Sequence, residues 1–183
     1  MIKVFVKNLK KKLLIRDISK DYYRLNVLGA FGAVKNYFRK EVSIKVIGDN
    51  CIELKPYIYT KETKSLVSSY GSILRNAFRD VNFGFSVLLE VRGVGAKVQH
   101  DLGDLTFNLG YSHPIKYRLP VGVVGRVLDD RGTLFLLLGN DRTKVLATAA
   151  KICLLKKKDV YKGKGIFFYA ENIALKEGKG KSA

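Results

Sequence analysis

The chain contains few of the residue types that build disulfides, metal clusters and acidic catalytic sites. It has no tryptophan, two cysteines and two histidines, and its 16 acidic residues stand against 34 lysines and arginines over 183 residues. Cys51 and Cys153 are far apart, which favours two reduced thiols over a disulfide framework or a zinc cluster. No apolar run approaches the roughly 20 residues that a membrane-spanning helix needs. We therefore expect no metal, no cofactor and no membrane span.

Positive charge is the most prominent property that is present. The formal net charge is +18 at pH 7 and the sequence pI is about 9.9. Much of this charge lies toward the ends, in residues 1–16 and 151–183. Such a field attracts RNA, DNA or an anionic membrane, and it carries no information about the fold. Because 47% of the residues are hydrophobic, packed cores are expected between the basic ends.

An internal repeat predicts the fold class. Residues Asn26–Val34 recur in outline as Glu90–Val98. A pair of strand-like segments around a turn follows each copy: Val42–Ile47 and Cys51–Lys55 after the first, and Val123–Leu128 and Thr133–Leu138 after the second. The second copy also gains an extra hairpin around Leu102–Asp104 and a proline-bearing turn at Leu109–Pro114. This divergence suggests that the second copy acquired the specific function.

A helix is predicted after each strand pair. The first should begin after Thr60, a plausible N-cap, with apolar residues at spacings of three and four: Leu66, Val67, Tyr70, Ile73, Leu74 and Ala77. The second should begin at Asn140 or Asp141, with Val145, Leu146, Ala149, Ile152 and Cys153 in the same spacing. The prediction is an α+β protein of two duplicated small domains, each an antiparallel sheet packed against one helix. We place a basic N-terminal extension at 1–23 and the two repeats at 24–83 and 84–183.

The segment Tyr161-Lys162-Gly163-Lys164-Gly165-Ile166 is the best candidate for a binding site. Glycines let the backbone approach a polyanion and offer their N–H groups, while lysines place positive charge on phosphate oxygens. Further cations flank the segment, namely Lys156, Lys157 and Lys158 before it and Lys176, Lys179 and Lys181 after it. This pattern suits a nucleic-acid backbone better than a small metabolite.

Three motifs of the chain together resemble the universal large-subunit ribosomal protein L6 family. They are Leu109–Pro114, the strand ending in Leu138-Gly139-Asn140-Asp141, and Tyr161–Ile166 with Tyr169 and Glu171 behind it. The resemblance covers Arg24 to Lys181 and is stronger in the second domain. The duplication agrees with it, since the family is built from two related domains. The family's usual bacterial opening is missing from Met1 to Tyr23.

The resemblance implies a structural, non-catalytic constituent of the large ribosomal subunit. Such a protein binds large-subunit rRNA mainly through its second domain, near the sarcin-ricin loop and the stalk base, where GTP-dependent translation factors dock. Its partners would be this rRNA, neighbouring ribosomal proteins and, transiently, translation GTPases. The contacts that transfer from the family are Tyr161, Lys162, Gly163, Lys164 and Gly165, with Lys179 and Lys181 in its basic tail.

Several alternatives stay open from the residues alone. Lys162 and Lys164 could belong to a solvated turn, and His113, before Pro114, is either a turn residue or an RNA contact. The rings of Tyr161, Phe167, Phe168 and Tyr169 could stack on bases or belong to a core. A free-standing RNA chaperone would be equally basic, although its sheet should expose aromatic side chains, whereas these sheet faces read as mostly aliphatic. An RNA-processing enzyme would need clustered carboxylates, and the acids here are scattered in turns.

The composition also bears on compartment. The chain has 24 lysines against 10 arginines and no tryptophan, which hints at an AT-rich genome such as an organelle's. Met1–Lys20 is basic, but it is rich in lysine instead of arginine and serine, which makes it a poor import presequence. We therefore expect a mitochondrial ribosome and synthesis inside the organelle, with the bacterial cytoplasm as the alternative.

Overall fold

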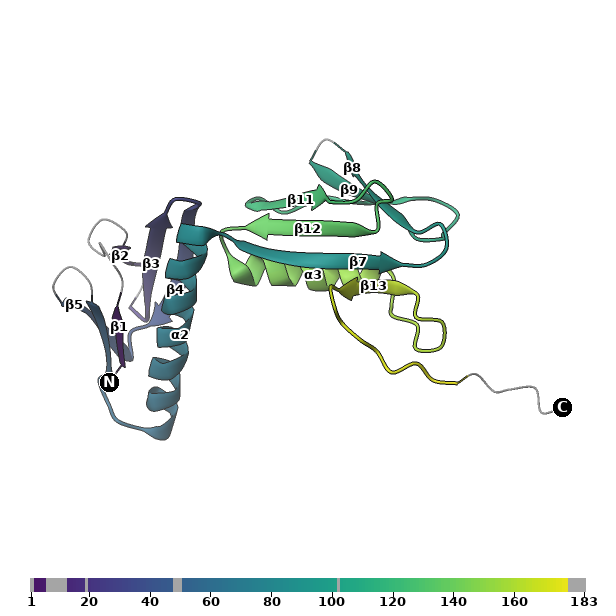
Figure 1. Cartoon of the computed structure of the whole chain (residues 1–183). Coiled ribbons are helices and arrows are strands. Elements are labelled where there is room, and N and C mark those ends of the chain that lie inside the picture. Colours follow the sequence, from purple (N-terminus) through teal and green to yellow (C-terminus); the bar gives the residue numbers. More distant parts are fainter. Residues whose placement is uncertain (1, 6–12, 19, 48–50, 102, 178–183) are drawn as a thin grey trace. The chain divides into compact units, whose positions relative to one another are not determined.

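A computed structural model describes residues 2–5, 13–18, 20–47, 51–101 and 103–177 (Figure 1). The chain divides into two compact units. The first comprises Met1–Gly84 with Asn140–Arg142, and the second comprises Phe85–Gly139 with Thr143–Ala183. Each unit has its own hydrophobic core, and both are α+β. The predicted fold class is confirmed.

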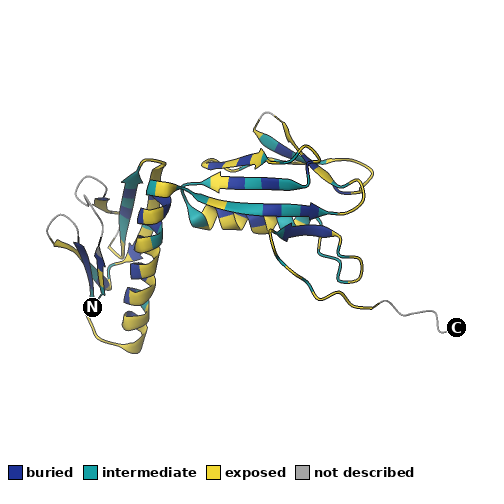
Figure 2. Ribbon diagram, in the orientation of Figure 1, coloured by how far each residue is buried: buried dark blue, intermediate teal, exposed yellow. Residues whose placement is uncertain are grey.

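Among its described residues, the first unit contains two antiparallel sheets and one helix. The strands are β1 (Ile2–Phe5), β2 (Leu13–Asp17), β3 (Tyr22–Gly29), β4 (Gly32–Arg39), β5 (Val42–Ile47) and β6 (Cys51–Pro56). They form sheets in the orders β1-β6-β5 and β2-β3-β4. Helix α2 (Lys61–Phe83) packs on both sheets, and its buried Val67, Leu74 and Val81 complete one core with Leu25 and Phe38. In Figure 2 the buried residues of this helix lie along one side.

The start of α2 follows from its capping residues. The Thr63 backbone N–H donates to Thr60 Oγ1 at 3.2 Å, and the Thr60 N–H donates to Thr63 Oγ1 at 2.9 Å. This reciprocal capping box satisfies two N–H groups, one of them an N-terminal helix donor that the helix itself leaves unpaired. The predicted N-cap at Thr60 is therefore confirmed.

The N-terminal segment takes part in the sheets of the first unit. Strand β1 pairs with β6, and β2 pairs with β3. Val4 and Leu13, from these two strands, belong to the core. The described parts of 1–23, which we expected to form an extension, thus contribute strands, because their apolar side chains cover the core beside α2.

The second unit has the same order of elements with additions. Its strands are β7 (Phe85–Arg92), β8 (Lys97–Asp101), β9 (Asp104–Asn108), β10 (Ile115–Tyr117), β11 (Val123–Val127), β12 (Leu134–Gly139) and β13 (Gly165–Phe168), and its helix is α3 (Arg142–Leu155). They form sheets in the orders β11-β12-β7-β13 and β10-β9-β8. The extra hairpin predicted in the second copy is β8 with β9, and the Phe107 and Phe135 rings join the two sheets edge to face at 5.6 Å.

Strand β13 extends the main sheet of the second unit after the helix. It pairs with β7, and its Ile166 and Phe167 are fully buried. The C-terminal segment therefore carries part of the core as well as the candidate binding residues.

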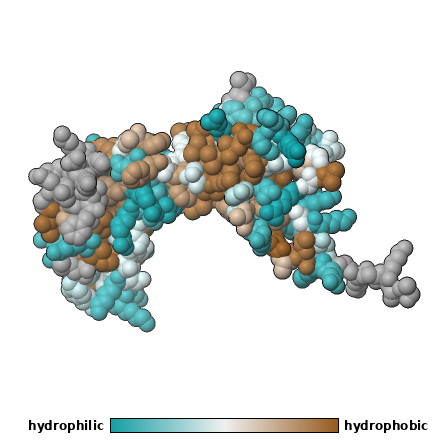
Figure 3. All heavy atoms as spheres, in the orientation of Figure 1, coloured by the Kyte–Doolittle hydropathy of each residue, from teal (hydrophilic) through white to brown (hydrophobic). Residues whose placement is uncertain are grey.

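On the same sheet, Leu138 and Val124 face each other in register and are exposed. Figure 3 shows apolar surface over this unit. Within the described residues, neither helix is long and apolar enough to cross a membrane.

Most of the predicted local elements are present. The predicted strand pairs correspond to β5 with β6 and β11 with β12, within one residue at each end. Helix α3 begins at Arg142, one or two residues after the predicted cap. Val145, Ala149 and Ile152 of its predicted stripe are buried, whereas Leu146 is 39% exposed. The predicted turn at 48–50 lies outside the described residues.

Candidate nucleic-acid interface

Tyr111 connects the loop Leu109–Pro114 to the end of α3. Its hydroxyl donates a hydrogen bond of 3.1 Å to the carbonyl of Leu155, the last helical residue. The Nζ of Lys156 lies 4.1 Å from the centroid of the Tyr111 ring, which is within the range of a cation–π contact. Two motifs far apart in the sequence are thus joined at the point where the basic segment begins. Tyr111 was not among the predicted site residues, although the motif that contains it was recognised.

A tight turn presents the residues between α3 and β13. The Asp159 N–H donates to the Lys164 carbonyl at 2.8 Å, and the Gly163 N–H donates to the Asp159 carbonyl at 2.9 Å. The Asp159 carboxylate accepts from the Tyr161 N–H at 2.9 Å. The C-terminal segment also holds the turn, because the Lys176 N–H donates to the Val160 carbonyl at 2.9 Å. The turn is therefore organised by the protein's own hydrogen bonds.

The two glycines of the turn are required by the backbone for different reasons. Gly163 has a φ of 64°, in the left-handed region, and a Cβ placed there would meet only Leu175, at an ordinary 3.5 Å. Gly165 has a φ of 137°, and its Cβ would lie 3.0 Å from both the Lys157 carbonyl oxygen and the Lys158 Cα. Glycine at 165 thus lets two backbone segments pack closely within the protein. Of these two glycines, only Gly163 remains a candidate for close approach of the backbone to a polyanion.

Lys158 and Glu171 form an ion pair beside β13. The Lys158 Nζ lies 2.6 Å from Glu171 Oε2, and the Phe168 N–H donates to the same oxygen at 3.1 Å. The hydrogen bond from Lys158 is the largest cause that holds the pKa of Glu171 below its ordinary value; desolvation opposes it, and the Phe168 N–H adds to it. Lys158 therefore has a partner within the protein, and so does Lys156, over Tyr111.

The other predicted lysines that the structure describes are exposed to solvent. Lys157, Lys162, Lys164 and Lys176 are exposed, as is His113, whose Nδ1 lies 3.3 Å from the Ser112 hydroxyl. Lys179 and Lys181 lie outside the described residues. The structure thus groups the predicted residues into exposed cations, partnered cations and glycines that shape the turn.

Aromatic side chains around the turn differ in their accessibility. Phe167 is fully buried, with the guanidinium carbon of Arg92 4.5 Å from its ring centroid, so this ring belongs to the core. Tyr161 and Tyr169 are 58% and 57% exposed, so both rings are accessible for stacking. The Arg92 guanidinium donates a hydrogen bond of 2.9 Å to Glu90 Oε2, and this bond is the largest cause that raises the pKa of Arg92. The sequence contained no signal for this arrangement, because Arg92 and Phe167 meet only through the pairing of β7 with β13.

Other chemistries find little support among the described residues. Within them, no group of three or more His, Cys, Asp or Glu side chains is arranged to hold a metal ion. Cys51 and Cys153 are free. Asp129, one of the turn acids, accepts hydrogen bonds from the Thr133 hydroxyl and from the Thr133 and Leu134 N–H groups. Although desolvation tends to raise the pKa of Asp129, these bonds outweigh it and lower the pKa. Asp129 therefore has the backbone role expected of a turn aspartate.

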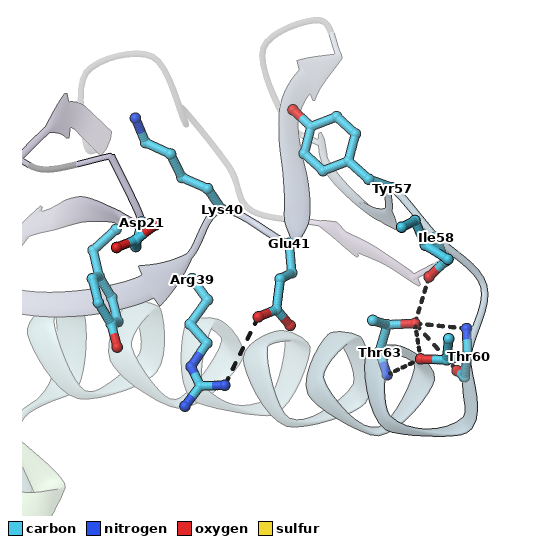
Figure 4. Close-up of a pocket in the computed structure, with 9 residues that line it drawn as sticks. Asp21, Arg39, Lys40, Glu41, Tyr57, Ile58, Thr60 and Thr63 are labelled. Carbon is cyan, nitrogen blue, oxygen red and sulfur yellow. Dashed lines mark hydrogen bonds and ion pairs between the residues drawn. The ribbon is translucent and has the colours of Figure 1, made fainter.

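A cavity of about 600 Å³ lies in the first unit, between the ends of β3 and β4 and the start of α2 (Figure 4). Its charged lining residues are of mixed sign: Asp21, Arg39, Lys40 and Glu41. Arg39 Nη1 and Glu41 Oε1 pair at 3.9 Å across an exposed position, where an ion pair contributes little. The balanced charge does not single out a ligand class, and all the predicted site residues belong to the second unit.

Comparison with known proteins shows the family. A family model described as ribosomal protein L6 matches residues 92–168. Two relatives named large ribosomal subunit protein uL6 are similar over most of their length. The one from Acidothermus cellulolyticus is 31% identical over 89% of this chain and 90% of its own, and the one from Mycoplasma capricolum is 34% identical over 85% and 84%. With both the motifs and the duplicated fold in agreement, the chain belongs to the ribosomal protein L6 (uL6) family.

Proposed function

We propose that this chain is a structural constituent of the large ribosomal subunit and that it binds large-subunit rRNA through the turn between α3 and β13. The observation that carries the proposal is the set of exposed lysines at 157, 162 and 164 on a turn that the protein itself holds in shape, with the exposed Lys176 of the C-terminal segment hydrogen-bonded to that turn. A preorganised turn loses little conformational entropy on binding, so each charge-assisted contact contributes more to affinity. Within this site, Gly163 supplies a partly exposed backbone position and Tyr161 supplies an accessible ring.

The proposed location is the rRNA near the sarcin-ricin loop and the stalk base, as the L6 resemblance implies. The test is chemical footprinting of large subunits assembled with and without the protein. We expect protection in that rRNA region, and weaker protection when Lys162 and Lys164 are both changed to Ala. Protection confined to other rRNA regions would contradict the location while leaving membership of the subunit intact.

The affinity for rRNA should depend strongly on salt, because each phosphate contact by Lys or Arg releases counterions. At about five contacts the slope of log affinity against log salt is about −4 to −5. The measurement is a filter-binding or fluorescence titration of purified protein with large-subunit rRNA at several salt concentrations. A slope flatter than about −2 would mean that the exposed lysines are not the contact surface.

Translation GTPases are the proposed transient partners. If the second unit supports the factor-binding region, subunits that lack the protein should stimulate a translation GTPase less. They should still bind normally those ligands whose sites lie elsewhere on the subunit. Adding back the parent protein should restore the stimulated rate, and adding back the double Lys162→Ala, Lys164→Ala variant should restore less of it. Full stimulation without the protein would exclude this role.

We further propose a mitochondrial ribosome as the location, on the basis of the lysine-rich, tryptophan-free composition. Sedimentation of mitochondrial and cytosolic extracts of the source cells tests this. The protein should co-migrate with the mitochondrial large subunit. Its absence from the mitochondria, or a source without them, would leave the bacterial-type ribosome as the location.

A further inference from the structure

The sheet β2-β3-β4 of the first unit has one buried and one solvent-facing side. Leu25, Val27, Val34 and Phe38 point into the core beneath α2 and are at most 5% exposed. Side chains alternate between the two faces of a strand, so the residues between them point outward. This outward face is not aliphatic, although the sequence suggested that the sheet faces would be.

Two cross-strand rows make up the centre of the outward face. In the first row Arg16 pairs with Arg24, which pairs with Tyr37. In the second row the paired residues are Leu14, Asn26 and Lys35. Paired residues share a face of the sheet. We name these two rows the basic sheet face; it carries three cations and an aromatic ring, and neither row contains an acid.

Accessibility differs across the basic sheet face. Tyr37 is 59% exposed and Leu14 is 45% exposed, and Arg16 and Lys35 are also exposed. The ring of Tyr37 is thus open to solvent at one edge of the face. A large aromatic side chain exposed beside cations is a common feature of surfaces that bind unpaired bases.

Two polar atoms at the centre of the face have no hydrogen-bond partner. They are Arg24 Nε, a donor, and Asn26 Oδ1, an acceptor, two residues apart on β3, and both are shielded from solvent. An enclosed polar atom without a hydrogen-bond partner destabilises the structure that contains it. A ligand that offers both an acceptor for Arg24 Nε and a donor for Asn26 Oδ1 would therefore favour rearrangement of these two side chains toward the ligand.

We propose that the basic sheet face is a second RNA-binding surface, which takes two or three nucleotides of single-stranded RNA. The cations match phosphate oxygens, and an arginine fork can bind them in pairs. The Tyr37 ring can stack on a base, and an asparagine amide can pair with a base edge. Strands lie about 4.8 Å apart and the rows about 7 Å apart along them, which limits the footprint to a few nucleotides. An acidic peptide would use the cations but neither the ring nor the amide.

The test uses the full-length protein and a fluorescent single-stranded RNA of about ten nucleotides and mixed sequence. Tyr37→Leu should weaken binding about fivefold to 100-fold, because it removes stacking while it retains an apolar side chain. Tyr59→Leu is the matched control, since Tyr59 is 64% exposed in the same unit but lies outside the face. It should change affinity by less than about twofold.

The charge on the face is tested separately. Lys35→Ala should reduce the slope of log affinity against log salt by about one, whereas Lys64→Ala, an exposed lysine of α2, should not. Thermal unfolding followed by circular dichroism verifies that each variant is folded. If Lys35→Ala behaves like Lys64→Ala, or Tyr37→Leu like Tyr59→Leu, the proposal is wrong.

Two further measurements separate this surface from the turn and from an acidic protein. Tyr37→Leu is combined with Lys162→Ala and Lys164→Ala; if the two surfaces are separate sites, Tyr37→Leu should weaken binding at its own site by the same factor with and without the lysine changes. A Tyr37 effect that persists when the lysine changes have none would support this surface and reject the turn. Polyglutamate should compete weakly with the RNA. Competition as strong as that by unlabelled RNA would mean that the face selects negative charge alone, which would overturn the proposal.

Discussion

Lys158 and Glu171 flank strand β13 and are joined by an ion pair, with 2.6 Å between Lys158 Nζ and Glu171 Oε2. Lys158 precedes the turn and Glu171 follows the strand. The pair thus encloses the segment that contains Lys162 and Lys164 and ties its two ends together. Lys158, which we predicted as an RNA contact, thus also stabilises the base of the turn.

The first prediction concerns pH and the Glu171 carboxylate. Its pKa is lowered in the folded protein, first by the hydrogen bond from Lys158. A carboxylate with a depressed pKa stabilises the fold above its unfolded pKa, near 4.5, and this contribution is lost as the pH falls through the lower folded value. Glu171→Gln should therefore destabilise the protein at pH 6–7 and much less at about pH 3. Urea unfolding at several pH values measures the difference.

Glu177→Gln is the control for this prediction, since Glu177 is exposed in the same C-terminal segment. It should leave stability unchanged across the same pH range. A constant difference between Glu171→Gln and the parent at every pH would show that the loss comes from packing, and the ion pair would then have no measurable role.

The second prediction concerns the exposed lysines of the turn. Changing Lys162 or Lys164 to Ala should weaken rRNA binding by about 1 kcal/mol each and reduce the salt slope by about one each. Lys97→Ala is the matched control, because Lys97 is an exposed lysine on β8 of the same unit. Titrations of affinity against salt compare the three variants. Equal effects at positions 97 and 162 would indicate a diffuse field and no localised contact.

The third prediction separates conformation from close approach at Gly163. Asn tolerates the left-handed region far better than Val, so Gly163→Asn should fold like the parent while Gly163→Val is strained. If the RNA backbone lies against Gly163, both variants should impair assembly into large subunits. Assembly is measured by sedimentation, and folding by circular dichroism. Normal assembly of the folded Asn variant would assign the glycine a conformational role alone.

The fourth prediction concerns packing at Gly165. Gly165→Ala should destabilise the second unit by about 1–3 kcal/mol. The added Cβ would meet the backbone of residues 157 and 158, and the φ of position 165 is unfavourable for any residue that has a Cβ. Gly93→Ala is the comparison, since Gly93 has a similarly unfavourable φ of 155° and its Cβ position meets only the Ala96 Cβ, at an ordinary 3.4 Å. It reports the cost of the conformation without the clash. Denaturant unfolding should give a larger loss for Gly165→Ala; equal losses would rule out the close contact as its cause.

Deletion of the C-terminal segment is unsuitable as a test of binding. Removing residues from 151 onward also removes Ile152 and Ile166, which belong to the core of the second unit, and the fully buried Phe167. Loss of RNA binding in such a variant would report unfolding. The point substitutions above leave these side chains in place.

Local patterns in the sequence were enough to predict the helices, the paired strands and the duplication. Thr60 begins α2 because a threonine oxygen can satisfy helix N–H groups within its own turn, and Val145, Ala149 and Ile152 share a face because of helical spacing. Hairpins such as β5 with β6 are also local, since the residues that pair are neighbours in the chain. The motifs at Leu109–Pro114 and Tyr161–Ile166 were sufficient to recognise the L6 family.

Only the tertiary structure decided which distant segments meet. The sequence could not show that β1 pairs with β6, that Tyr111 caps the end of α3, or that Lys158 binds Glu171. Each of these contacts depends on which buried surfaces pack together, and many alternative partners share the same residue types. The exposed lysines of the turn and the basic sheet face therefore became distinguishable from partnered or buried residues only once the two cores had placed them.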